Sequence, residues 1–275
     1  MKTRIIWGIL GAVLFLFLII QGGTLLTVAV GVLSVLATAE VCKIFKKTGV
    51  DLQVPLVILF NLALIIGEAV NWGQPAVNTG FVRSGGWLAP AAFVLLFISF
   101  LLRLNKGISQ ANFVTIISHL LILFYPGFLF VYPLLIRKHS TPPGWQLLLF
   151  AFVVIWGTDT GAYFIGSAVG KSPLAPRLSP KKTVEGALGG LVVGTLAGVL
   201  LGLVFQLPFF WLVGTGFLTS FFGQVGDLFA SFLKRLAGVK DSGRFLPGHG
   251  GVLDRFDSAL FSLPVVYYLA FFLPG

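Results

Sequence analysis

The chain has 275 residues, of which 57% are hydrophobic and only 10% are charged, whereas about a quarter of the residues of an average soluble domain are charged. This composition excludes an ordinary water-soluble domain and indicates an integral membrane protein. The formal net charge of +10 would suggest nucleic-acid binding in a soluble protein. In a membrane protein it is typical of basic loops on the cytoplasmic side, so we expect no nucleic-acid partner.

Cysteine and histidine usage limits the metal chemistry. A single cysteine, Cys42, forms neither a disulfide framework nor a thiolate cluster within one chain. The histidines, His119, His139 and His249, are scattered without the spacing of a zinc site. Any metal site must therefore be built from carboxylates.

Apolar runs between polar breaks predict an all-α, polytopic integral membrane protein with about nine transmembrane helices. The first run has a charged start like a signal peptide, but residues 21–23 form a poor cleavage site, so we interpret it as an uncleaved helix. In chain order the runs are Ile5–Ile20, Thr24–Val41, Val54–Val70, Trp87–Leu102, Phe113–Ile136, Gln146–Ala168, Leu188–Leu207, Pro208–Phe229 and Ala259–Leu273.

The positive charges predict how these helices are oriented. With nine spans, 16 of the 19 Lys and Arg residues fall on the side of the N-terminus. Only Arg83, Arg137 and Lys138 fall on the opposite side. Because positive residues gather in the cytoplasm, we predict a cytoplasmic N-terminus in the cell inner membrane, with loops 169–187 and 230–258 also cytoplasmic.

Acidic residues divide the chain into two regions. Six of the nine acidic residues lie between positions 159 and 257. We therefore predict an N-terminal transmembrane scaffold of about five helices at 1–145, and a C-terminal catalytic transmembrane region of about four helices at 146–275.

The seventh run carries a glycine at every fourth position. Such a repeat leaves a groove along one helix face, where another backbone can approach closely, and it predicts a packing seam. The alternative is that glycine is simply common in membrane helices. The glycines are Gly186, Gly190, Gly194, Gly198 and Gly202.

Residues 231–257 are dense in groups that suit a phosphate ligand and a hard metal ion. Several glycines there let the backbone approach a ligand closely. The cations are Lys234, Arg235, Lys240, Arg244 and Arg255, and the carboxylates are Asp241, Asp254 and Asp257. His249 lies between glycines and is interpreted either as a catalyst or as a hydrogen-bonding loop residue.

Three aspartates suggest a Mg²⁺ site. Asp254 and Asp257 share one face if the last helix begins near Leu253. Asp227 lies in a strongly apolar run, where a charge is costly unless it faces a polar cavity. Mg²⁺ takes oxygen ligands and is often shared with substrate phosphates. The structural alternatives are a surface pair of Asp254 with Arg255 and a helix-packing role for Asp227.

A second group of polar residues precedes the seventh run. Helix N-termini attract anions, and two lysines strengthen that attraction, so we predict phosphate binding there. The alternative is ordinary anchoring by positive residues on the cytoplasmic side. The group consists of Ser179, Lys181, Lys182, Thr183 and Glu185. Asp159 interrupts the sixth run and is interpreted as lining a polar cavity, in contact with substrate or a metal ligand, or else as a packing residue.

The stretch 231–257 resembles the signature of the phosphatidate cytidylyltransferase (CDP-diacylglycerol synthase) family. Residues 150–265 as a whole look like the C-terminal half of that family. The matching positions are Ser231, Lys234, Arg235, Lys240, Asp241, Gly243, Leu246, Pro247, His249, Gly250, Gly251, Asp254, Arg255 and Asp257.

The resemblance implies that CTP and phosphatidate react to give CDP-diacylglycerol and pyrophosphate in a homodimeric enzyme embedded in the lipid bilayer. It implies Mg²⁺ at Asp227, Asp254 and Asp257, with K⁺ as a candidate second cation. We predict that these aspartates are catalytic together with Lys234, Arg235 and His249. Substrate binding is predicted for Ser179, Lys181, Lys182, Thr183, Glu185, Asp159, Lys240, Asp241, Arg244 and Arg255.

We expect metal-assisted in-line attack on CTP, because the main task is to bring two polyanions together. Two other functions compete with this one. A transporter could use Asp159 and Asp227 as ion-pathway residues. An alcohol phosphotransferase that consumes CDP-diacylglycerol also uses several aspartates, but the chain lacks the D-G-x-x-A-R opening expected there.

Overall fold

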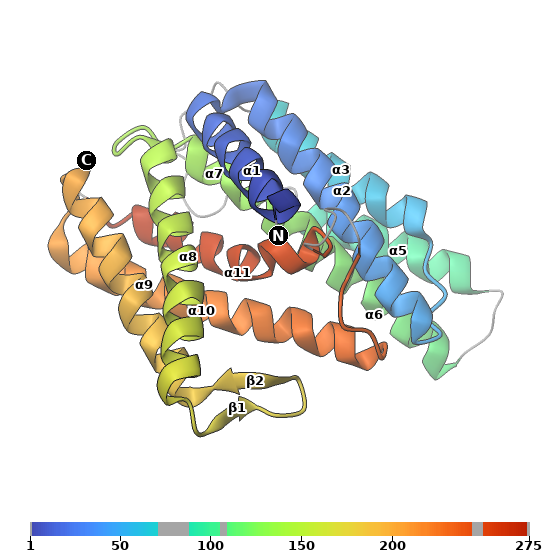
Figure 1. The fold of residues 1–275 in the computed structure, drawn as a ribbon. Coiled ribbons are helices and arrows are strands. Elements are labelled where there is room, and N and C mark those ends of the chain that lie inside the picture. Colours follow the sequence, from blue (N-terminus) through green and yellow to red (C-terminus); the bar gives the residue numbers. More distant parts are fainter. Residues whose placement is uncertain (1, 71–87, 105–108, 244–249, 274–275) are drawn as a thin grey trace.

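A computed structural model describes residues 2–70, 88–104, 109–243 and 250–273. Within these ranges the chain is nearly all-α, as predicted, with one short β-hairpin (Figure 1). The elements are α1 (Lys2–Gln21), α2 (Gly23–Lys47), α3 (Val54–Val70), α5 (Leu88–Leu104), α6 (Gln110–Ile122), η2 (Leu123–Phe128), η3 (Leu129–Val131), α7 (Tyr132–Arg137), α8 (Gly144–Val169), β1 (Pro173–Ala175), β2 (Ser179–Thr183), α9 (Val184–Val204), α10 (Phe209–Leu236) and α11 (Leu253–Ala270).

Each predicted apolar run overlaps a helix of the structure. The fifth run is a single helical stretch, Gln110–Arg137, whose middle winds as a π-helix around Pro126 and then as a 3₁₀ turn. In the described part of the chain, five helices are long and apolar enough to cross a membrane: α2, the stretch Gln110–Arg137, α8, α9 and α10. The larger count of nine spans and the cytoplasmic N-terminus stay predictions.

Large apolar side chains cover the outside of this bundle. Phe210 of α10 is 89% exposed, and Leu200 of α9 and Phe93 of α5 are also strongly exposed. Exposed apolar surface on this scale is a liability in water but is suited to lipid. The surface therefore agrees with the membrane class inferred from composition.

The interior is one hydrophobic core that runs from Ile19 of α1 to Ala270 of α11. Aromatic contacts join the two predicted regions of the chain inside it. The ring of Tyr125 in η2 lies 4.8 Å from that of Phe229 in α10, edge to face. The N-terminal helices are thus packed directly against the helices predicted to carry the chemistry.

The β-hairpin lies in predicted loop 169–187 and was not predicted. Its strands are short, and Pro173, Pro176 and Pro180 gave the segment the appearance of an irregular loop. β1 and β2 pair antiparallel, with Pro173 opposite Thr183 and Ala175 opposite Ser179. The hairpin projects beyond the ends of α8 and α9 (Figure 1).

The glycine seam is confirmed: Gly186, Gly190, Gly194 and Gly198 pack against α8, and Gly202 packs against Leu212 of α10. A methyl group on Gly186 would lie 2.8 Å from the carbonyl oxygen of Ala162, and one on Gly190 would lie 2.8 Å from that of Thr158. α8 and α9 accordingly lie against each other along their length (Figure 1). The seam fixes α8 beside the start of α9, where the polar residues of both helices meet.

We predict that Gly194→Ala weakens the α8–α9 seam. The added methyl would overlap the Thr158 hydroxyl and lie 2.9 Å from the Val154 carbonyl oxygen. Overpacking of this kind costs about 1–3 kcal/mol. The thermal unfolding midpoint in detergent should fall. Gly214→Ala is the matched control, because nothing lies within 4 Å of a methyl at that position of α10; equal midpoints for the two variants would contradict the seam.

Candidate active site

A cavity of about 510 Å³ lies where α8, the hairpin, α9 and α10 meet. Its volume is in the range of small-molecule binding sites. α8 contributes Asp159, Ala162, Tyr163, Gly166 and Ser167, whose spacing of three and four residues places them on one helix face. The other lining residues are Leu174, Lys181, Lys182, Thr183, Gly186, Ala187, Gln224 and Asp227.

The hairpin brings two lysines to this cavity. Its base is held by Glu185, whose carboxylate accepts hydrogen bonds from the backbone N–H groups of Lys171 (3.1 Å) and Ser172 (3.1 and 3.2 Å). The Thr183 hydroxyl caps α9 by accepting from the N–H of Gly186 at 3.1 Å. Glu185 and Thr183 thus fix the strand that carries Lys181 and Lys182.

Lys182 forms an ion pair with Asp227 of α10 across the cavity. Both side chains are partly exposed. Gln224, one turn earlier on α10, lines the same wall and donates from Nε2 to the carbonyl oxygen of Ala187 at 3.1 Å. The predicted placement of Asp227 in a polar cavity is therefore observed, as is that of Asp159.

A close contact between α10 and α11 places Asp257 beside Asp227. A methyl on Gly226 would overlap the carbonyl oxygen of Asp257, so the two backbones touch there. The Asp257 residue is only 8% exposed. Burial raises the pKa of the Asp257 carboxyl above its ordinary value, and the negative charge of Asp227 raises it further. Burial and the charge of Asp227 thus oppose ionisation of Asp257 at this contact.

Asp254, one turn before Asp257, is held by a network of donors. Lys234 Nζ donates to its Oδ1 at 2.6 Å, and its Oδ2 accepts from the N–H and hydroxyl of Ser242, both at 2.9 Å, and from the N–H of Gly251 at 3.0 Å. Burial opposes ionisation of Asp254, but the Lys234 bond and the backbone donors outweigh it and hold the pKa below its usual value. Asp254 is therefore an ionised, fully bonded carboxylate.

Other predicted site residues do not line the cavity. Arg235 donates to the carbonyl oxygens of Leu178 (3.1 Å) and Val239 (3.2 Å), which ties the end of α10 to the hairpin. Ser179 pairs within the hairpin. Lys240, Asp241 and Arg255 are exposed and do not line the cavity. Arg244 and His249 lie outside the described residues.

Sequence reasoning missed Glu40 of α2 and Ser242. Glu40 is buried and accepts three hydrogen bonds from Ser242, Val252 and Leu253 around the start of α11. An acidic residue within an apolar run is the signal that identified Asp159 and Asp227, and Glu40 carries the same signal. Glu40 lies within residues 1–145, which are predicted as scaffold without site residues.

The positions of Asp227, Asp254 and Asp257 bear on the predicted Mg²⁺ site. Among the described residues, no three acidic, histidine or cysteine side chains converge on one metal position. The carboxyl groups of Asp227 and Asp257, which are close enough for the charge of Asp227 to raise the pKa of Asp257, do fit the way Mg²⁺ is commonly held, by one or two carboxylates together with substrate phosphates and water. Both oxygens of Asp254 already accept hydrogen bonds, so the three-aspartate site stays a prediction.

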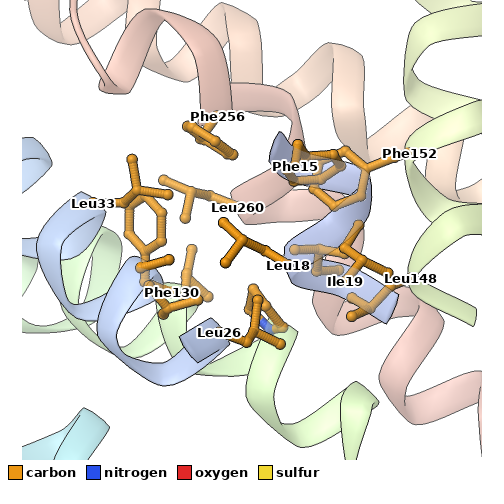
Figure 2. Close-up of a pocket in the computed structure, with 16 residues that line it drawn as sticks. Phe15, Leu18, Ile19, Leu26, Leu33, Phe130, Leu148, Phe152, Phe256 and Leu260 are labelled. Atoms are coloured by element: carbon orange, nitrogen blue, oxygen red, sulfur yellow. The ribbon is translucent and has the colours of Figure 1, made fainter. Parts of the chain in front are cut away.

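A second, apolar cavity lies between α1, α2, α8 and α11 (Figure 2). Phe256 and Leu260 of α11 face Phe15 of α1 and Phe152 of α8 across it. Its volume is about 50 Å³, and all of its lining residues are apolar. A dry pocket of this size offers nothing to a phosphate, so the polar cavity is the candidate active site.

Comparison with known proteins identifies the family of this chain. The sequence pattern of the cytidylyltransferase family matches residues 2–273. The chain is 38% identical to the phosphatidate cytidylyltransferase of Bacillus subtilis, over 98% of this chain and 97% of that protein. It is 35% identical to that of Staphylococcus aureus and 36% to that of Staphylococcus saprophyticus, over 98% of each chain. The resemblance of residues 231–257 is confirmed: the chain belongs to the cytidylyltransferase family of CTP-using nucleotidyltransferases.

Proposed function

We propose that this protein transfers the cytidylyl group of CTP to phosphatidate, forming CDP-diacylglycerol and pyrophosphate for phospholipid synthesis. The observation that carries the proposal is the polar cavity, in which Lys181 and Lys182 face Asp159 and Asp227. The relatives from Bacillus subtilis and Staphylococcus aureus are phosphatidate cytidylyltransferases, which supports the substrate pair.

Access to the cavity suits one water-soluble substrate and one lipid. The hairpin contributes exposed Lys181 on one side. On another side Tyr163, which lines the cavity, is 71% exposed, and its neighbour Phe164 is also strongly exposed. A nucleotide can approach past the hairpin, and a lipid headgroup can approach along the apolar face of α8.

The reaction needs neutralisation of charge more than proton transfer. A phosphate oxygen of phosphatidate attacks the α-phosphorus of CTP, and the bond from that phosphorus to the departing pyrophosphate breaks. Since the attacking phosphate is already anionic, no general base is required. Lys181 and Lys182 hold the phosphates, and Asp159 and Asp227 shape the opposite wall. Mg²⁺, held by Asp227 and Asp257, would supply additional positive charge to the phosphates.

The predicted cytoplasmic location of the site is part of the proposal. Arg235 joins the end of α10 to the hairpin between α8 and α9, and Glu40 near the end of α2 contacts the start of α11. The loops at these helix ends are the ones that carry most of the positive charge, which favours the cytoplasmic side. A homodimer and K⁺ as a second cation also stay predictions.

We expect purified protein to release pyrophosphate from CTP only when phosphatidate and Mg²⁺ are both present. Diacylglycerol, which lacks the attacking phosphate, is the control lipid and should give no release. A transporter would release none with either lipid. An alcohol phosphotransferase would instead release CMP from CDP-diacylglycerol, and either result would contradict the proposal.

Asp227→Asn should reduce kcat by about 100-fold or more, because it removes the carboxylate that pairs with Lys182 and would hold Mg²⁺. Asp51→Asn is the control, because it makes the same chemical change at another position. Asp51 is exposed and pairs with Arg103 in the N-terminal half, away from the cavity. Both variants should elute as folded protein. Near-normal turnover of the Asp227 variant would contradict its assigned role.

Lys182→Gln should raise the KM for CTP about tenfold, as expected for loss of one charge-assisted contact. Lys171→Gln tests the alternative that hairpin lysines act only as positive anchors. Lys171 is exposed in the same segment and does not line the cavity. If the two substitutions had equal effects on KM, general charge would explain the lysines and phosphate binding by Lys182 would be wrong.

A further inference from the structure

The carboxylate of Glu40 binds a segment that lies between 202 and 213 residues away in the sequence. Glu40 lies near the end of α2 and is only 7% exposed. Its Oε1 accepts from the N–H of Val252, and its Oε2 from the N–H of Leu253, both at 2.9 Å. The Oε2 atom also accepts from the Ser242 hydroxyl at 2.8 Å.

Two of these donors are at the N-terminus of α11. The first N–H groups of a helix have no partner within the helix, and a negative charge there is favourable. Val252 is the N-cap residue of α11 and has no side chain that could satisfy them. Glu40 therefore caps α11 from another helix, and so fixes where α11 begins.

The Ser242 hydroxyl connects Glu40 to Asp254. It lies 2.8 Å from Glu40 Oε2 and 2.9 Å from Asp254 Oδ2. A hydroxyl carries one proton and donates to one acceptor at a time. The two carboxylates therefore share a single donor, and a shift of Glu40 changes the bonding of Asp254.

The loop approaches Glu40 so closely that two of its positions have no room for a side chain. A methyl on Gly243 would overlap Glu40, and its three nearest atoms would all belong to the Glu40 side chain. A methyl on Gly251 would overlap the Ser242 hydroxyl and both Glu40 carboxylate oxygens. The fit is specific to a carboxylate at position 40 and glycine at these two positions.

We propose that Glu40 is a positioning residue for cytidylyl transfer. It fixes the positions of Ser242 and of the start of α11. Asp254 then stays hydrogen-bonded to Lys234, and Asp257 lies beside Asp227. Glu40 touches no cavity residue itself, and its effect is exerted through α11. The expected effect on kcat rests on the proposed function. The expected effect on the start of α11 rests only on the contacts described above.

The kinetic test compares Glu40→Ala and Glu40→Gln with Glu68→Gln. Misplacement of a catalytic group by about 1 Å costs on the order of 100-fold, so Glu40→Ala should lower kcat by about that factor with little change in the KM for CTP. Glu40→Gln keeps one acceptor oxygen and should fall between Glu40→Ala and wild type. Glu68 is the matched control: it is also 7% exposed, and it pairs with Lys138 at 3.1 Å, away from α11.

The direct contact is tested by a double-mutant cycle with Gly243→Ala. This substitution should reduce kcat in the wild-type background, where its methyl meets Glu40. In the Glu40→Ala background the methyl has space, so adding Gly243→Ala should lower kcat little further. The proposal would be overturned if the loss of kcat in the double variant equalled the product of the two single losses. A normal kcat in folded Glu40→Ala protein would overturn it as well.

Hydrogen exchange supplies a readout that does not depend on the substrate. The amides of Val252 and Leu253 should exchange faster in Glu40→Ala than in wild type, while those of α8 stay unchanged. Unchanged exchange at both positions would overturn the inference even if activity fell. A wild-type protein without cytidylyl transfer would contradict the proposed function alone and leave this structural result intact.

Discussion

The constraint on which the site depends is that a carboxylate inside an apolar bundle must find a partner from another element. A buried unpaired charge is far more costly than a buried pair. Glu68 meets Lys138, Asp227 meets Lys182, and Asp254 meets Lys234. Glu40 forms no ion pair with the residues that the structure describes, and it accepts instead from the start of α11. Each of these contacts joins segments distant in the sequence, so the acids determine which helices meet.

Glycine residues allow these helices to approach one another closely. α8 and α9 touch along the glycine seam, and Gly226 brings the backbone of α10 against α11 at Asp257. Apolar attraction between helices is weak when lipid is equally apolar, so close backbone packing supplies much of the specificity. Asp159, Asp227 and Asp257 come from three helices and lie near one another because small residues let those helices approach.

The sequence predicted the helices better than their interactions. Long apolar runs need no partner to be recognised, so each predicted run corresponds to a helix. The hairpin was missed because prolines and lysines mask short strands. The Lys182–Asp227 pair and the capping of α11 by Glu40 depend on contacts across 45 and 212 residues, which helical periodicity does not encode. Glu40 itself could have been found, because its charge in an apolar run was visible.

The ion pairs also limit how a nucleotide can bind. Lys182 is already neutralised by Asp227, so a phosphate that takes Lys182 leaves that carboxylate without its cation. In a partly buried site this loss opposes binding unless another positive charge reaches Asp227. The buried Asp257 carboxyl lies at the same contact, and the charge of Asp227 opposes its ionisation. Under the proposed function, CTP would therefore bind together with a cation. The aspartates would repel the phosphates of free CTP. They would attract the cation, and through it the phosphates, when CTP carries one.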